Sequence, residues 1–267
     1  MNSRTSNAWV GGVLLASLLL VTGGCQRLKA RDEMRKGVEN YTAGRYDAAI
    51  ENFKIALQAD PELLNAQLYL ATTYTNKYVP GSEEENNLKI AEQAITEFQA
   101  VLQKDPNNVA SIASLANLFF QMKRLDEAKE YYRKQIAADP ANAGGYYMVG
   151  VINWSQVYQP RIVLKTRLRL KPEDPIKDVK EREALAERNN PLIDEGMDML
   201  NKAMGLRPDY DDAMAYVNLL YREKADLVAT PTEREEFLKT ADEWIAKSLA
   251  IKKKRQTEEA AKQSEAS

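Results

Sequence analysis

The apolar residues between Gly44 and Pro61 recur at intervals of three and four positions. They are Tyr46, Ala49, Ile50, Phe53, Ala56 and Leu57. This spacing puts them on one face of a helix, with Gly44 before its start and Pro61 after its end. The small alanines leave room for a neighbouring helix to approach Phe53. The stretch therefore predicts an amphipathic helix that packs closely against another helix.

The same helix ending returns along the chain at a regular interval. Asp-Pro pairs close the predicted helices at Pro61, Pro106 and Pro140, and the interval from Pro106 to Pro140 is about 34 residues. The interval from Pro61 to Pro106 is longer, and its excess falls around Tyr78–Ser82, where a loop between two helices is tolerated. A further ending at Pro208 follows Pro140 at twice the period that separates Pro106 from Pro140.

These helix pairs and their period resemble the tetratricopeptide repeat (TPR), a helix-turn-helix unit of about 34 residues. The resemblance implies an all-α fold, a right-handed superhelical solenoid of TPR hairpins over residues 30–251. Gly37 stands where the family usually has a small residue at the crossing of the first two helices. Residues 143–208 hold either an insert or a hidden extra unit, so the count is five or six. The expected units are about 30–63, 64–108, 109–142, 143–208 and 209–251.

Two C-terminal segments show other patterns. Apolar and basic residues alternate along 161–171, which fits a strand. The segment also fits a helix that begins at Pro160, and the all-helical neighbourhood favours the helix. Thr230 and Pro231 suit the cap and first position of a last helix. After Ile251 the chain becomes strongly charged, and residues 252–267 are expected to form a disordered tail.

The segment 1–24 resembles a bacterial lipoprotein signal peptide. An apolar run ends in Gly-Gly before Cys25, and it is short for a membrane span. Thr22 departs from the leucine usual in such signals. The resemblance implies cleavage before Cys25, lipidation of Cys25 and a tether over 25–29. Gln26 favours the outer over the inner membrane of a bacterial cell envelope. A plain signal peptide or an uncleaved anchor is the alternative.

Composition narrows the chemistry. The formal net charge is −2 and the isoelectric point about 5.6, which argues against nucleic-acid partners. The chain has no histidine, and Cys25 is its single cysteine, which excludes His/Cys metal clusters and a disulfide within the chain. No nucleotide, hydrolase or calcium-binding motif occurs. We expect no metal, no cofactor and no catalysis; an enzyme that uses carboxylates alone is the remaining alternative.

In TPR arrays the first helix of each unit lines a concave groove, and we expect a protein or peptide partner there. The aromatic residues among the candidates for this groove could equally be part of the hydrophobic core. Met34 and Val38 stand where some TPR domains hold a carboxylate clamp, so none is expected. The candidate groove residues are Tyr41, Thr72, Asn117, Phe120, Gln121, Tyr147, Val151 and Trp154.

The basic stretch within 161–171 is a second candidate surface. It would meet anionic lipid headgroups or an acidic partner, since each nearby Lys or Arg adds about 1 kcal/mol at an anionic surface. The alternative is a solvated face of an insert. The residues are Arg161, Lys165, Arg167, Arg169 and Lys171.

The sequence thus favours a non-catalytic adaptor or scaffold lipoprotein of the bacterial cell envelope, anchored by its N-terminal lipid and facing the periplasm. Envelope lipoproteins of this plan serve outer-membrane barrel assembly, pilus secretin assembly and peptidoglycan remodelling. The pattern does not choose among these pathways, nor does it give the partner or the oligomeric state. The other hypotheses are the carboxylate-only enzyme and a cytoplasmic-facing array on an uncleaved anchor.

Overall fold

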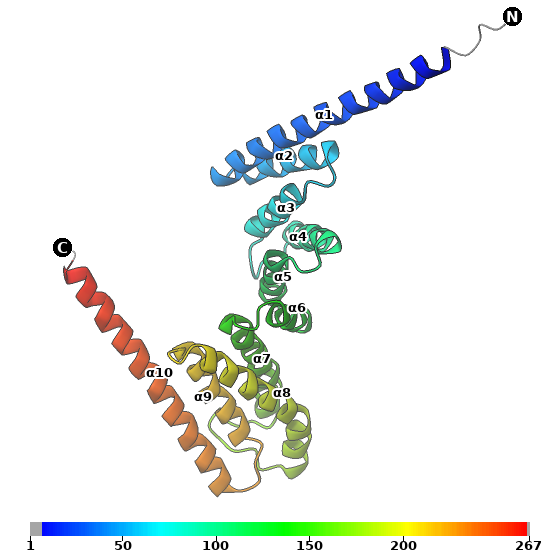
Figure 1. Cartoon of the computed structure of the whole chain (residues 1–267). Coiled ribbons are helices and arrows are strands. Elements are labelled where there is room, and N and C mark those ends of the chain that lie inside the picture. Colours follow the sequence, from blue (N-terminus) through cyan, green and yellow to red (C-terminus); the bar gives the residue numbers. More distant parts are fainter. Residues whose placement is uncertain (1–6, 266–267) are drawn as a thin grey trace, which may run out of the picture. The chain divides into compact units, whose positions relative to one another are not determined.

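The computed structural model describes residues 7–265, and its side chains are described over 25–263. All regular elements in this part of the chain are α-helices (Figure 1). This confirms the predicted all-α class. The chain divides into an N-terminal unit, Met1–Lys123, and a C-terminal unit, Arg124–Ser267.

In the N-terminal unit, α1 and α2 form one hairpin, and α3 and α4 form the next (Figure 1). Helix α2 also packs on α3, and α4 packs on α5, so each helix covers the apolar face of the one before it. The helices are α1 (Asn7–Thr42), α2 (Tyr46–Ala59), α3 (Leu64–Lys77), α4 (Glu85–Lys104) and α5 (Val109–Gln121).

In the C-terminal unit, α6 packs on the first helix of the hairpin α7/α8, and α8 packs on α9. Helix α10 lies along α9 and closes the unit (Figure 1). The helices are α6 (Leu125–Ala138), α7 (Ala143–Arg167), α8 (Val179–Leu206), α9 (Asp211–Ala225) and α10 (Pro231–Glu265).

The proline-ended helices stop for the reason that the sequence suggests. The residue before each proline has left the helical conformation, with φ between −142° and −131°. A following proline ring clashes with a helical residue and drives it towards an extended conformation. These residues are Asp60, Asp105, Asp139 and Arg207.

The next helix is capped by polar side chains at several of these junctions. Asn108 Oδ1 accepts a hydrogen bond from Ser111 N at 3.0 Å, and Asn142 Oδ1 accepts one from Gly144 N at 2.9 Å. Thr230 and Glu233 form a reciprocal capping box at the start of α10, with both backbone bonds at 3.2 Å. The predicted cap at Thr230 and first helical position at Pro231 are confirmed.

The core of the first hairpin is built on Gly37 and Phe53. The Phe53 ring is fully buried and stacks on Tyr69 with centroids 5.6 Å apart. A Cβ on Gly37 would lie 2.4 Å from Phe53 Cε1, a distance that no side chain tolerates. The prediction that a small residue lets the two helices cross at this point is confirmed.

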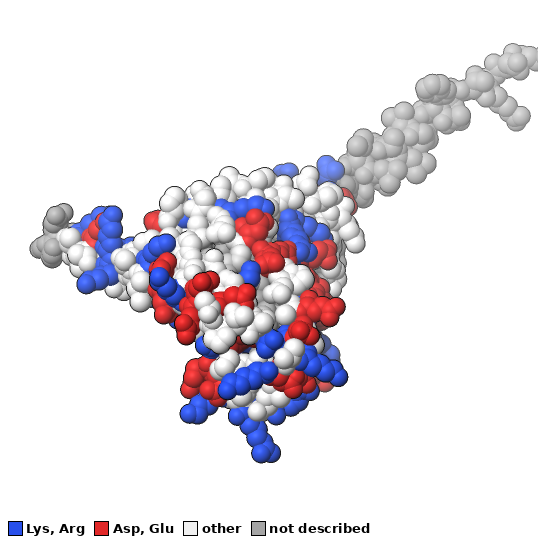
Figure 2. Space-filling model, turned by 90° about the horizontal axis from the view of Figure 1, so that it is seen from below, with Lys and Arg blue, Asp and Glu red and all other residues white. Residues whose placement is uncertain are grey.

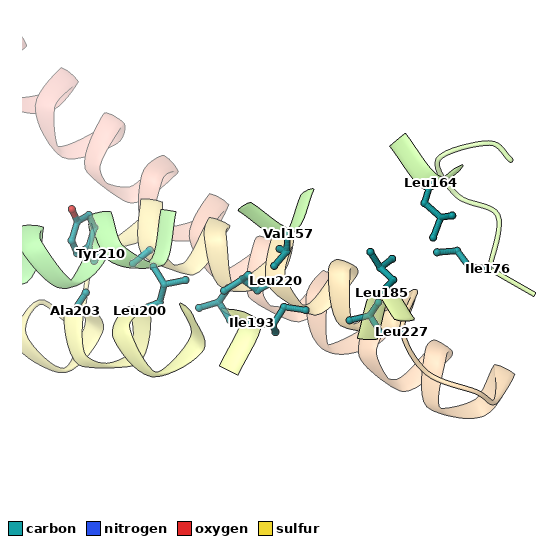
Figure 3. Packing of buried hydrophobic residues seen from close by; sticks show 12 residues of the cluster. Val157, Leu164, Ile176, Leu185, Ile193, Leu200, Ala203, Tyr210, Leu220 and Leu227 are labelled. Carbon is teal, nitrogen blue, oxygen red and sulfur yellow. The ribbon is translucent and has the colours of Figure 1, made fainter. Parts of the chain in front are cut away.

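The core of the C-terminal unit is one apolar cluster shared by α7, α8 and α9 (Figure 3). Leu164 and Ile176 lie side by side in it, with Leu185 and Leu227 next to them (Figure 3). Ile176 belongs to the segment 168–178, so this long connection is tied into the core. The central members are Val157, Ile193, Leu200, Ala203, Val217 and Leu220.

The fourth unit, residues 143–208, is longer than the other repeat units. Between Pro140 and Pro208 the described chain forms one hairpin, whose helices have 25 and 28 residues. Residues 161–167 are helical as favoured, but Pro160 lies inside α7 rather than at its start. Its missing N–H weakens the helix, while Val157 before it and Leu164 after it in the sequence are buried in the core.

Two predicted irregular segments are helical. Residues 25–29, expected to be a tether, belong to α1, and residues 252–265, expected to be disordered, belong to α10. Lys, Arg, Glu, Gln and Ala dominate both segments and favour helix without any need for burial. In α10 the exposed end also gains a bond from Arg255 Nη2 to Asp211 Oδ1 at 2.8 Å.

The predicted signal peptide, residues 1–24, lies outside the residues whose side chains the structure describes. Cys25 is exposed on α1. Among the residues that are described, no helix combines the length and the apolar character needed to cross a bilayer.

We expect Gly37→Ala to lower the free energy of unfolding by about 1–3 kcal/mol, because Phe53 must move from a fully packed position. Gly205→Ala, within α8, is the matched control, since a Cβ there meets nothing within 4 Å. In a helix that change should instead stabilise by up to about 1 kcal/mol. Urea unfolding followed by circular dichroism measures both. Equal effects of the two substitutions would contradict the packing at Gly37.

Candidate binding surfaces

Two candidate groove residues of the N-terminal unit, Tyr41 and Thr72, are half-buried and already engaged. The Tyr41 ring meets the ring of Tyr69 edge-on at 5.8 Å, and its hydroxyl accepts a hydrogen bond from Asn76 Nδ2 at 2.9 Å. Thr72 Oγ1 donates to the carbonyl of Leu68 at 2.8 Å. Tyr41 therefore contributes mainly to the packing of α1 on α3.

The three candidates on α5 are more open. Asn117 and Gln121 are exposed, and Phe120 is half-buried. Their spacing of three and four places them on one face of the helix. That face presents two amides beside an aromatic ring, a combination that suits hydrogen bonding to a peptide backbone.

The candidates Tyr147 and Trp154 are brought together by a residue that the sequence did not suggest. Tyr216 of α9 meets Tyr147 edge-on at 5.7 Å and Trp154 at 5.4 Å. Tyr158 extends the contact beyond Trp154, and Tyr210 extends it beyond Tyr147. We call Tyr147, Trp154, Tyr158, Tyr210 and Tyr216 the aromatic row. All but Tyr210 are half-buried.

The aromatic row is partly core. Burial raises the pKa of Tyr147 and of Tyr216, so both remain neutral phenols at physiological pH. Trp154 Nε1 is buried and has no hydrogen-bond partner among the described residues. Val151, between the two α7 rings, is buried at 4 % exposure, so its expected role in direct contact with a partner is wrong.

The sequence spacing could have predicted part of the aromatic row. Tyr158 follows Trp154 by four positions, the spacing that places two side chains on the same helix face. Tyr216 lies in the first helix of the next unit, where groove residues are expected, but the sequence alone does not show that its ring reaches both α7 rings.

The basic stretch 161–171 is not one surface, which corrects that prediction. Arg161 is buried against α9, where it forms a bidentate pair with Glu223 at 2.6 and 2.9 Å and contacts Asp226 at 3.0 Å. Lys165 is buried beside it, 2.5 Å from Asp226, and donates to the carbonyl of Pro172 at 2.6 Å. Neither cation can reach a lipid headgroup.

Electrostatics explain why these charges are paired so fully. Burial raises the pKa of Glu223 and lowers the pKa of Lys165, and the ion pairs oppose both shifts. A buried charge without such partners costs several kcal/mol. We call Arg161, Lys165, Glu223 and Asp226 the buried ion cluster.

The other three basic residues, Arg167, Arg169 and Lys171, are exposed. Arg167 pairs with Glu181, and Arg169 occupies the left-handed region with φ 57° just after α7 ends. Figure 2 shows Lys and Arg interspersed with Asp and Glu over the face in view. No single-sign field is present on that face.

A hollow of about 750 Å³ lies among α6, α7 and α8. Pro160 and Val163 line it together with Leu125 and Arg188, and Val163 is 65 % exposed. The pair between Lys129 and Glu195, at 2.8 Å, joins α6 to α8 beside it. Sequence reasoning missed this hollow, because it depends on the separation of three helices.

The carboxylates in the described part of the chain do not form a cluster that could bind a metal ion. No group of three metal-ligating side chains occurs there. Asp211 and Asp212 are adjacent carboxylates at the start of α9. Asp211 is buried and bonded to Arg255, while Asp212 is exposed.

Removing Glu223 should be far more damaging than removing Glu181. Glu223→Ala leaves Arg161 buried beside a single remaining carboxylate, and we expect a loss of about 3–5 kcal/mol of unfolding free energy. Glu181→Ala removes the partner of exposed Arg167 and should cost at most about 1 kcal/mol. Urea denaturation of both variants measures the difference, and similar losses would contradict the burial of the ion cluster.

Comparisons with known proteins agree with the hairpin architecture. A tetratricopeptide repeat family model matches residues 91–148, which contain the period from Pro106 to Pro140. A search of curated proteins found no match.

Solved structures extend the likeness over most of the chain. A crystal structure of MamA protein is 18 % identical, covers 86 % of this chain and 94 % of its own, and has a TM-score of 0.59. MamA from Desulfovibrio magneticus RS-1, from residue 41 to its end, is 17 % identical over 85 % and 96 %, with a TM-score of 0.57. The chain therefore has the all-α fold of a TPR solenoid.

Proposed function

We propose that this chain is a non-catalytic scaffold that binds a protein or peptide segment along the first helices of its hairpins. The observation that carries this is the aromatic row, in which half-buried rings of α7 and α9 adjoin. Tyrosine and tryptophan at such positions offer large apolar area with little side-chain entropy to lose, which suits them to recognition.

Support also comes from α5 in the N-terminal unit. Asn117 and Gln121 are exposed amides on the face that carries Phe120. Amides beside apolar rings bind the backbone and side chains of an extended segment together. In the fold that this chain shares with TPR arrays, the first helices line the concave face, so they are the better candidates for a partner.

We further propose that a lipid on Cys25 holds the scaffold at the bacterial cell envelope, facing the periplasm, with the outer membrane favoured by Gln26. The support is the small-residue sequence before Cys25 and the exposure of Cys25 on α1. Two or more acyl chains anchor a protein stably, whereas one chain binds only marginally.

A photo-crosslinking amino acid at Gln121 tests the binding face in living cells. We expect it to capture one envelope protein, because Gln121 is exposed at the end of α5. Gln99, the same residue type on the second helix α4, is the matched control and should capture nothing in common. Phe120→Ala should reduce the capture at Gln121 several-fold. Equal capture at the two positions would remove the face from consideration.

Mass spectrometry of the membrane fraction tests the anchor. We expect a mature chain that begins at Cys25 and carries acyl chains, and Cys25→Ser should leave the protein unprocessed and without lipid. Ser17→Ala, inside the apolar run, is the control and should be processed normally. A wild-type chain that keeps Met1 would exclude the lipid anchor and support the uncleaved one.

A further inference from the structure

A second hollow lies at the end of the C-terminal unit where α8 and α10 begin. It measures about 430 Å³ and is formed by the end of the segment 168–178, the start of α8 and the α9–α10 connection. That volume is in the range of small-molecule sites in proteins, about 300–1,000 Å³. It is separate from the aromatic row and does not depend on the proposed scaffold function.

The walls of this hollow are largely apolar. Ile176 and Val179 come from one side, and Val228 and Pro231 come from the other. Val179 is 54 % exposed although it opens a helix beside the core. Ile176 is buried in the apolar cluster, so the floor of the hollow is rigidly held.

The charges at the hollow are mostly positive. Lys177, Arg182 and Arg234 line it with a single carboxylate, that of Glu235. Arg182 Nη1 donates to the carbonyl of Ile176 at 3.3 Å, and within the described residues neither Arg182 nor Lys177 has an ion-pair partner. Both cations are therefore available to pair with an anion in the hollow.

Arg234 is also under-compensated. Its Nη2 donates to the carbonyl of Glu173 at 2.6 Å, and its Nε is buried without a hydrogen-bond partner among the described residues. Asp226 Oδ1 lies 3.8 Å from Arg234 Nη2, but the Asp226 carboxylate already forms ion pairs with Arg161 and Lys165. Three cations thus share the carboxylates of Glu223 and Asp226, which leaves one excess positive charge beside the hollow.

We propose that this hollow binds a carboxylate carried on a branched apolar group, of the size of a single acylated amino acid. The guanidinium groups of Arg182 and Arg234 supply the planar donors that match a carboxylate. Ile176, Val179 and Val228 cover the apolar part. Among the described residues, no aromatic side chain lines the hollow, so it offers no stacking surface for a nucleobase.

Methyl NMR of the full chain, labelled at Ile, Leu and Val, tests this with N-acetyl-L-leucine as the probe. The methyls of Ile176, Val179 and Val228 should shift saturably. N-acetyl-L-leucinamide, which lacks the charge, and N-acetylglycine, which lacks the apolar group, should each bind at least about tenfold more weakly. Equal binding of either compound would overturn the proposal.

Charge variants locate the anion. Arg182→Gln should weaken N-acetyl-L-leucine binding about tenfold. Lys180→Gln, an exposed cation two positions away that does not line the hollow, should leave it unchanged. If both variants weakened N-acetyl-L-leucine binding equally, the anion would be attracted only by net charge, which would overturn the proposal. Inorganic phosphate that shifts the same methyls as strongly would make the site an anion site without apolar selectivity and overturn the proposal.

Discussion

Close approach of helices at glycine is the constraint on which both units depend. Gly37 faces the ring of Phe53, Gly150 faces Leu200, and Gly196 faces Leu220; an added Cβ would lie 2.4, 2.5 and 2.9 Å from them. Because these glycines have no side chain, a large apolar residue of the next helix sits directly against the backbone. A helical hairpin has too little apolar area to be stable alone, so such contacts must continue from helix to helix.

The lengthened fourth hairpin is held by a further kind of interaction, a set of buried ion pairs. Helix α7 extends past the ordinary repeat, and Leu164 in its last turns packs in the apolar cluster with Leu185 of α8 and Ile176. The buried ion cluster joins these last turns to the end of α9, and the carbonyls of Pro172 and Glu173 bind Lys165 and Arg234. Ion pairs cost desolvation and so stabilise less than apolar packing, but they fix geometry. The connection 168–178 is held in one position as a result, and its Lys177 lies at the small hollow with Arg182 of α8 and Arg234 of α10.

Local patterns predicted the features that depend on neighbouring residues. The Phe53 helix, its proline stop and the Thr230 cap all follow from residues within about one or two turns of each other. The buried ion cluster could not be predicted in this way, since Arg161 bonds to residues 62 and 65 positions later. A run of basic residues is usually solvated, and only the fold reveals that two of the five basic residues in 161–171 meet buried carboxylates. The helical end of α10 was missed for the opposite reason: a charged composition without apolar residues still has high helix propensity.

The groove residues show why periodicity cannot separate a binding face from a core. Tyr147, Val151 and Trp154 follow one another at spacings of four and three, so they share a face of α7. That face meets α9, where Tyr216 contacts both rings, and short Val151 between them is buried. The longer aromatic side chains extend past the packed layer and stay half-exposed. Side-chain length, as much as position in the repeat, decides which first-helix residues remain available to a partner.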